Sequence, residues 1–248
     1  MSAQQATPRD QFLEGIVQSL PIIVGVAPFG MLFGMLAVEN DFSVGEAVFM
    51  SATIYAGASQ LVGIDLFGSR VAPWLIVLSI FAVNFRHVLY SASLGRYFAR
   101  WPIGQQIIGY FLLVDPLFAE TERRISRGGR LHFAWYMGMG LTLYIVWLIT
   151  TYLGAVFGPL IPDPHAIGID FLLAIFFFCT VLTFRTRHNW FPIAASSALG
   201  AILAYKTIGS PWHVTVGALV GVLVGAFLPP TVSGSPPAEQ DNTGDPTL

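Results

Sequence analysis

The sequence has few charged residues and almost no cysteine, and both shortages exclude whole classes of protein. Only 10% of its 248 residues are Asp, Glu, Lys or Arg, whereas soluble domains carry about a quarter. The formal net charge of −2 provides no basic surface for nucleic acid. The single cysteine, Cys179, cannot form an internal disulfide and has no metal-site spacing, so we expect neither a bound metal nor another cofactor.

Apolar residues, in contrast, make up 54% of the chain and form uncharged runs long enough to cross a bilayer, which takes roughly 17 to 25 residues. A helix satisfies its own backbone polar groups in lipid, so these runs predict an all-α, polytopic membrane bundle. Five runs are clear spans, at residues 15–38, 47–64, 137–157, 190–205 and 212–228.

Three further runs are each interrupted by one ionisable residue, at Arg86, Asp115 and Asp170. Without these residues the fourth and sixth runs are short enough to be re-entrant or interfacial. We therefore expect about eight membrane segments, some short or broken, in a transporter domain at residues 13–228. Residues 1–12, on the cytoplasmic side, and the Pro-, Ser- and Gly-rich residues 229–248 are predicted to be disordered.

Eight spanning segments place both termini on one side of the membrane, and the basic residues choose which. With the termini in the cytoplasm, the inner loops hold most of the arginines and the outer loops hold three basic residues, so the bias follows the positive-inside rule. A re-entrant hairpin at the second run is the alternative; it would move the N-terminus outside and weaken this bias. The inner set is Arg9, Arg70, Arg123, Arg124, Arg127, Arg130, Arg185 and Arg187, and the outer set is Arg96, Arg100 and Lys206. A solvated cytoplasmic loop is expected at residues 120–124.

Two glycine-containing stretches are candidate binding positions. In Gly25-Val-Ala-Pro-Phe-Gly30, Pro28 removes a backbone donor, which either opens a site or only kinks the helix. In Tyr55-Ala-Gly-Ala-Ser-Gln60, a half-helix that begins near Gly57 directs free N–H groups at an anion such as a carboxylate. Ser59 and Gln60 then contribute side-chain polar groups, or they simply join neighbouring helices.

A third stretch, Asn84-Phe-Arg-His87, places an arginine that cannot lose its charge within an apolar segment. Arg86 needs a carboxylate, backbone carbonyls or a ligand anion, unless it extends to an interface. His87 titrates near physiological pH and is a candidate for proton coupling. Asp115 and Asp170 can each balance Arg86, receive a substrate ammonium group or exchange a proton. Asp170 can also be a helix N-cap.

Glycines four residues apart indicate close helix contacts. They occur at Gly30 and Gly34, at Gly154 and Gly158, and at Gly217, Gly221 and Gly225. The third set packs either within the chain or against another subunit.

The chain resembles the AzlC family of bacterial inner-membrane proteins from about Phe12 to Leu228. The resemblance rests on Pro-Phe-Gly in the first span, Ala-Gly-Ala-Ser-Gln at 56–60, Asn-Phe-Arg-His-Val-Leu-Tyr at 84–90, and Gly-Ile-Asp-Phe at 168–171. It implies export of branched-chain or other apolar amino acids, together with a small AzlD-type membrane partner. Pro116 follows Asp115 where the family is expected to have another polar residue.

The sequence therefore predicts a secondary transporter of valine-like amino acids, coupled to protons, in the bacterial inner membrane. No G-x-x-x-x-G-K-[ST] loop is present for nucleotide binding. Two alternatives stay open. One is an intramembrane hydrolase that uses Ser59, His87 and Asp115, although Ser59 lacks the G-x-S-x-G context. The other is a scaffold or regulatory subunit that transports nothing. We expect the chain not to be an enzyme.

Overall fold

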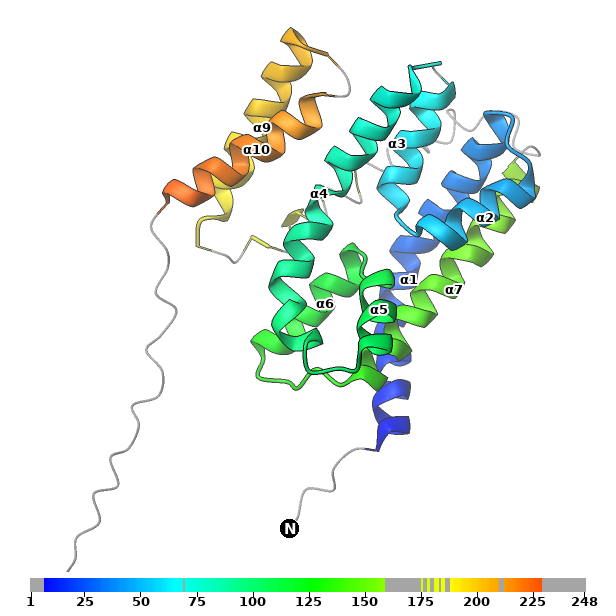
Figure 1. Ribbon diagram of the computed structural model, residues 1–248, viewed down its shortest axis with the longest axis vertical. Coiled ribbons are helices and arrows are strands. Elements are labelled where there is room, and N and C mark those ends of the chain that lie inside the picture. Colours follow the sequence, from blue (N-terminus) through cyan, green and yellow to red (C-terminus); the bar gives the residue numbers. More distant parts are fainter. Residues whose placement is uncertain are drawn as a thin grey trace, which may run out of the picture. The chain divides into compact units, whose positions relative to one another are not determined.

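A computed structural model describes residues 7–68, 70–158, 175, 178, 181–182, 184–185, 188–209 and 212–228. The described residues contain helices and no strand, as predicted (Figure 1). They belong to two compact units, Met1–Cys179 and Thr180–Leu248. Asp170, Cys179 and the tail at 229–248 lie outside the described residues, so the expectations for them stay predictions.

Three helices of the first unit are long and apolar enough to span a membrane: α1 (Pro8–Glu39), α4 (Pro73–Phe98) and α7 (Phe133–Phe157). α1 starts with a capping box in which the Thr7 hydroxyl accepts from the Asp10 N–H and the Asp10 carboxylate accepts from the Thr7 N–H. The predicted disorder of residues 1–12 is therefore wrong from Pro8 onward, because this cap allows the helix to extend beyond the apolar run.

α1 and α7 run parallel and touch along their glycines. A Cβ at Gly34 would collide with the Thr151 carbonyl oxygen, and a Cβ at Gly154 would collide with the Met31 carbonyl oxygen. Only glycine permits such close backbone approach, and dispersion across this contact holds membrane helices together. Two of the predicted glycine pairs thus lie at one helix–helix contact inside the chain.

The second predicted span is a hairpin of two short helices, α2 (Val44–Ile54) and α3 (Gly57–Gly68). Tyr55, in the left-handed region with φ 43°, ends α2 and turns the chain back. The end of α3 returns to the end of α1, because the Phe67 ring lies 5.2 Å from that of Phe42, just before α2. A segment that enters and leaves at the same end of the unit is re-entrant.

The fourth predicted span is also a hairpin, formed by α5 (Ile103–Phe111) and α6 (Asp115–Ser126). Its two outer ends both lie where α1 and α7 begin. Trp101, before α5, stacks edge-on against Phe133 at 5.1 Å, and Arg124, near the end of α6, bonds to Glu14 at 2.7 Å. This hairpin therefore enters the unit from the end opposite to that of α2–α3 (Figure 1).

These hairpins correct the predicted distribution of charge. Arg96 and Arg100 were assigned to the outside, but α4 runs toward the start of α7, where the Phe98 ring packs 5.2 Å from Tyr136. They lie on the same side as Arg127. The expected loop at residues 120–124 is instead part of α6, because its charged side chains find partners on α1 and α4.

The second unit contains α9 (Trp190–Thr207) and α10 (Trp212–Phe227), which pack against each other. The third glycine set faces α9: a Cβ at Gly217 would lie 2.7 Å from the Ala201 Cβ, and one at Gly221 would lie 3.0 Å from the Ser197 Cβ. The Ser197 hydroxyl also donates to the Gly217 carbonyl at 2.9 Å. Of the two predicted alternatives, packing within the chain accounts for these glycines.

Candidate functional site

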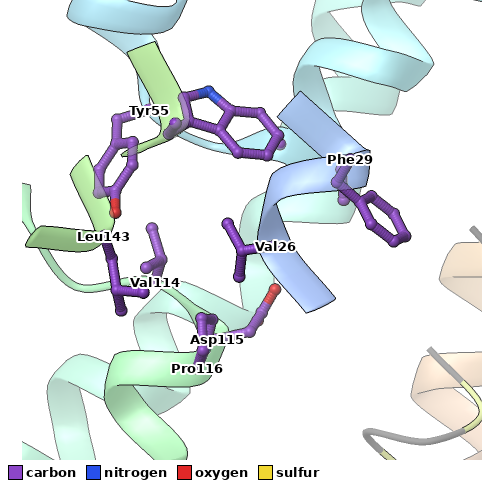
Figure 2. A pocket seen from close by; sticks show the side chains of 10 residues that line it. Val26, Phe29, Tyr55, Val114, Asp115, Pro116 and Leu143 are labelled. Atoms are coloured by element: carbon purple, nitrogen blue, oxygen red, sulfur yellow. The ribbon is translucent and has the colours of Figure 1, made fainter. Parts of the chain in front are cut away.

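The tips of the two hairpins meet at a cavity inside the first unit. The cavity is lined by Val26, Phe29, Tyr55, Gly57, Ala58, Val114, Asp115, Pro116, Leu143 and Trp147. Figure 2 shows Tyr55 and Asp115 on opposite walls, with Val26, Val114 and Leu143 between them. Its volume of about 60 Å³ holds a few water molecules, since each needs at least about 10–15 Å³. The walls are apolar, and Asp115 is the one charged residue among the described lining residues.

One wall is the start of α3, where the N–H groups of the first helical turn have no partner within their own helix. A Cβ at Gly57 would lie 2.7 Å from Cη2 of Trp147, so a glycine is needed for the indole to approach this turn. The Tyr55 ring packs edge-on against Tyr144 at 4.9 Å, and the Tyr144 hydroxyl donates to the Ala52 carbonyl at 2.8 Å. The break between α2 and α3 is thus held by aromatic side chains from α7.

A buried polar cluster fixes this break from behind. Ser51 Oγ accepts from Gln60 Nε2 at 3.1 Å and from Trp147 Nε1 at 3.2 Å. Both nitrogens can only donate, so the Ser51 O–H is left to donate to Thr151 Oγ1 at 2.9 Å. Gln60 Oε1 in turn accepts from the Ala56 N–H at 3.3 Å, within the turn itself.

The opposite wall is the start of α6, where Asp115 occupies the first turn and complements the positive end of the helix dipole. Arg86 Nη1 lies 3.0 Å from Asp115 Oδ2, and the Tyr90 hydroxyl donates to Asp115 Oδ1 at 2.7 Å. The Arg86 and Asp115 side chains are 22% and 16% exposed. Of the predicted anions for Arg86, the structure brings Asp115 into an ion pair with it.

The other predicted site residues lie around these two walls. Ser59 Oγ donates to Asn84 Oδ1 and so joins α3 to α4. Pro28 lies inside α1, next to the cavity residue Phe29. The His87 ring lies 5.6 Å from that of Tyr90.

No hydrogen bond joins Ser59 to His87 in the part of the chain that the structure describes, so Ser59, His87 and Asp115 do not form a nucleophile, base and orienter there. The same part contains no group of three or more His, Cys, Asp or Glu side chains that could hold a metal ion.

Sequence reasoning missed Tyr90, Ser51 and Trp147. Tyr90 follows Arg86 by four residues and therefore shares its helix face, so this spacing was a usable signal. Ser51 and Trp147 carry no such signal, because their contacts join residues 96 positions apart in the chain.

The fold and the site define a multi-pass helical membrane protein with a cavity between two re-entrant hairpins. The model of the AzlC protein family matches residues 21–161, a range that includes both hairpins and the whole of α4 and α7. The chain belongs to this family, as its motifs predicted.

Several relatives cover nearly all of the chain. It is 31% identical to the inner membrane protein YgaZ of Escherichia coli K12, over 90% of this chain and 91% of YgaZ. It is 29% identical to an uncharacterized membrane protein of Archaeoglobus fulgidus, over 90% and 94% of the two chains. An uncharacterized membrane protein of Helicobacter pylori 26695 is 23% identical, over 86% and 92%. No solved structure matches the chain significantly.

Proposed function

We propose that the protein is a secondary transporter that exports branched-chain or other apolar L-amino acids across the bacterial inner membrane. The observation that carries the proposal is the cavity between the hairpin tips, which combines apolar walls with a carboxylate on one side and a helix N-terminus on the other. Broken helices that meet at mid-depth are the usual construction of transporter binding sites.

The two ends of a zwitterion match the two polar walls. The substrate carboxylate accepts from the N–H groups at the start of α3, near Gly57, where the helix dipole is positive. The substrate ammonium group binds Asp115 and competes with Arg86 for it. Val26, Phe29 and Leu143 contact the aliphatic side chain. Selectivity among aliphatic substrates is modest, because one methylene contributes only about 1–3 kcal/mol.

Transport in this proposal is coupled to protons, with Asp115 or His87 as the exchanging group, and needs a small AzlD-like membrane subunit. Both groups lie beside the Arg86 ion pair, so protonation changes the charge balance at the cavity. The predicted contribution of Asp170 is part of the same proposal.

The arrangement of the first unit supports a cytoplasmic N-terminus. Basic residues lie almost entirely on the side where α1 begins, and the other side has Arg70 with several acids. The side where α1 begins holds Arg9, Arg96, Arg100, Arg123, Arg124, Arg127 and Arg130. The side where α1 ends holds the acids Glu39, Asp41 and Glu46 in addition to Arg70. Cytoplasmic loops carry such an excess of basic residues. A cytoplasmic C-terminus is part of the proposal.

The test is efflux of preloaded labelled valine from cells that carry this chain, with and without an AzlD-like partner. Asp115→Asn and Arg86→Ala are expected to abolish efflux, whereas Arg123→Gln, at an exposed arginine whose ion pair with Glu120 lies within α6, is expected to leave it unchanged. Efflux unaffected by Asp115→Asn contradicts the site, and efflux of no amino acid under a proton gradient contradicts the function. A pH jump that leaves the rate unchanged contradicts proton coupling.

A further inference from the structure

The first six helices repeat one pattern twice. A long helix, α1 or α4, is followed by four residues, at 40–43 and again at 99–102. A short helix, α2 or α5, is then followed by a break of two residues at 55–56 or three at 112–114. The pattern ends with a helix of 12 residues in each half, α3 and α6. The repeat is visible in the lengths of the helices and connections and not in the amino-acid sequence.

Contacts recur at spacings that differ by one residue between the two halves. In the first half, Phe29 and Gly57 line the cavity together, and a Cβ at Gly68 would collide with Asn40, so α1 and α3 run parallel. Residues 29 and 57 are 28 positions apart, as are residues 40 and 68.

In the second half, Arg86 pairs with Asp115, and the Ser93 hydroxyl donates to Glu122 at 2.5 Å, so α4 and α6 run parallel as well. The spacing there is 29 positions.

The two halves point in opposite directions. Ser59 on α3 bonds to Asn84, and a Cβ at Gly63, one turn later, would lie 3.3 Å from Ile80, one turn earlier. α3 therefore runs antiparallel to α4. The α2–α3 hairpin enters from the side where α1 ends, and the α5–α6 hairpin enters from the side where α4 ends. Two equivalent halves of opposite direction meet at their tips around one cavity.

We infer that α1–α3 and α4–α6 are inverted-topology repeats, and that each hairpin is the gate between the cavity and one side of the membrane. Inverted repeats of this kind support alternating access, because each half can adopt the conformation of the other. The cavity between the two tips is where such a cycle would hold its substrate. The gating part of this inference rests on the proposed transport function, and the topology does not.

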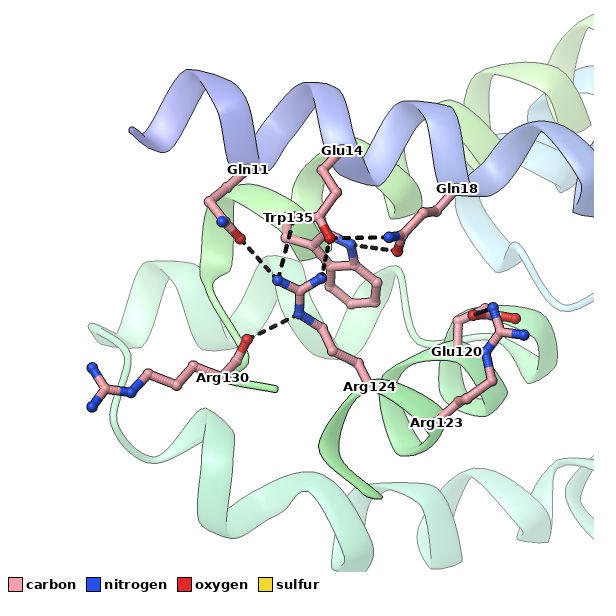
Figure 3. A network of polar contacts seen from close by, with 8 residues as sticks. All are labelled: Gln11, Glu14, Gln18, Glu120, Arg123, Arg124, Arg130 and Trp135. Carbon is pink, nitrogen blue, oxygen red and sulfur yellow. Dashed lines mark hydrogen bonds and ion pairs between the residues drawn. The ribbon is translucent and has the colours of Figure 1, made fainter. Parts of the chain in front are cut away.

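The α5–α6 gate is held shut by Arg124, which lies among three helices (Figure 3). Arg124 donates to Glu14 Oε1 at 2.7 Å, to Gln11 Oε1 at 3.0 Å and to the Arg130 carbonyl at 3.0 Å. Its guanidinium also stacks 4.7 Å from the buried Trp135 ring. Asp115 and Arg124 are on one helix of 12 residues, about 18 Å long at 1.5 Å per residue. Release of Arg124 frees the hairpin to move away from α1.

The topology is tested by labelling with a membrane-impermeant maleimide in a Cys179→Ser background. Four exposed positions lie at the outer ends of the hairpins: Gly45→Cys in the first turn of α2 and Arg70→Cys after α3, and Gly104→Cys in the first turn of α5 and Arg127→Cys after α6. A Cβ at Gly45 or Gly104 meets open space. We expect the first pair to react from one face of the membrane and the second pair from the other. A pair that reacts from opposite faces overturns the repeat, because its segment then spans the membrane.

The gate is tested with a single cysteine at Ala58, which lines the cavity. Arg124→Gln and Glu14→Gln are expected to raise its labelling rate from the Arg124 side by about tenfold, because charged hydrogen bonds of the closed state are lost. The charge exchange Glu14→Arg with Arg124→Glu should restore slow labelling. Arg123→Gln is the matched control, since Arg123 pairs with Glu120 in its own helix.

A labelling rate in Arg124→Gln and Glu14→Gln equal to that of the Arg123→Gln control overturns the gate. Size-exclusion profiles identify any variant that fails to fold. Neither labelling assay uses a substrate, so failure of the inference is distinguishable from failure of valine efflux, which would contradict the proposed function alone.

Discussion

Ser51 has the most demanding hydrogen-bond position of the residues around the site. It is fully buried and accepts from two side chains that hold the α2–α3 break. Ser51→Ala leaves the Gln60 amide and the Trp147 indole N–H without an acceptor. Each buried, unsatisfied donor costs about 1–3 kcal/mol, so we expect the loss of both acceptor contacts to lower the free energy of unfolding by about 2–6 kcal/mol.

Thermal unfolding in detergent, followed by tryptophan emission, measures this change. Ser79→Ala is the matched control, because Ser79 is also buried but its hydroxyl donates to the Leu75 carbonyl of its own helix. That carbonyl keeps its helical role, so we expect a loss below about 1 kcal/mol. Equal losses in the two variants would contradict the importance of the Ser51 contacts.

The Arg86–Asp115 pair gives a second prediction at this scale. Asp115→Asn leaves a mostly buried cation without its counter-charge, and Arg86→Gln leaves a mostly buried carboxylate in the same situation. The double variant removes both charges, so it should be more stable than the sum of the single losses predicts. A thermal-unfolding double-mutant cycle should give a coupling energy of about 0.5–3 kcal/mol. A coupling near zero would mean that the two charges do not stabilise each other.

The sequence predicted which polar and charged side chains lie at the site better than it predicted which residues they contact. Arg86 in an apolar run demanded an anion, and Asp115 was among the three anions considered. Ser59 and Gln60 were recognised as polar residues within the membrane, but their contacts with Asn84 and Ser51 could not be derived. Such partners depend on how helices distant in sequence are packed, and a single sequence does not contain that register.

The parallel packing of α1 and α7 makes the clearest prediction for whole elements. Gly34→Ala introduces a Cβ that collides with the Thr151 carbonyl oxygen, a backbone atom that cannot rotate away. Overpacking of this kind costs about 1–3 kcal/mol, so we expect a lower midpoint of thermal unfolding. Gly25→Ala on the same helix is the control, because its Cβ meets open space. A Gly34→Ala variant as stable as Gly25→Ala would exclude this close contact.

Segment lengths predicted where the helices lie better than whether each segment crosses the membrane or turns back. The apolar runs located α1, α4 and α7, and the short fourth run was a candidate for a re-entrant segment. The second run is long enough to span because two short helices are adjacent in sequence, and the prediction preferred a span to the re-entrant alternative. The left-handed Tyr55 turns the chain back between the two helices. Nothing in that residue type demands a turn, since tyrosine rarely adopts positive φ. Arg96 and Arg100 were assigned to the outside because the second run was counted as one crossing of the membrane.

At the scale of the whole molecule, the proposed substrate should stabilise the folded protein by mass action. A ligand that binds only the folded state adds about 2.7 kcal/mol at 100 times its dissociation constant. We expect valine, leucine, isoleucine and methionine to raise the midpoint of thermal unfolding in detergent. Glycine should have a smaller effect, because it lacks the side chain that contacts Val26 and Leu143.

Charged amino acids provide the sharpest comparison, because the described lining contains one charged residue, Asp115, which in the proposed pose is occupied by the α-ammonium group. Lysine and glutamate must then bury a side-chain charge with no partner, which is strongly unfavourable. They should leave the unfolding midpoint unchanged, and Asp115→Asn should remove the shift caused by valine. A shift by lysine equal to that of valine would contradict an apolar substrate. A valine shift retained in Asp115→Asn would place the binding site outside this cavity.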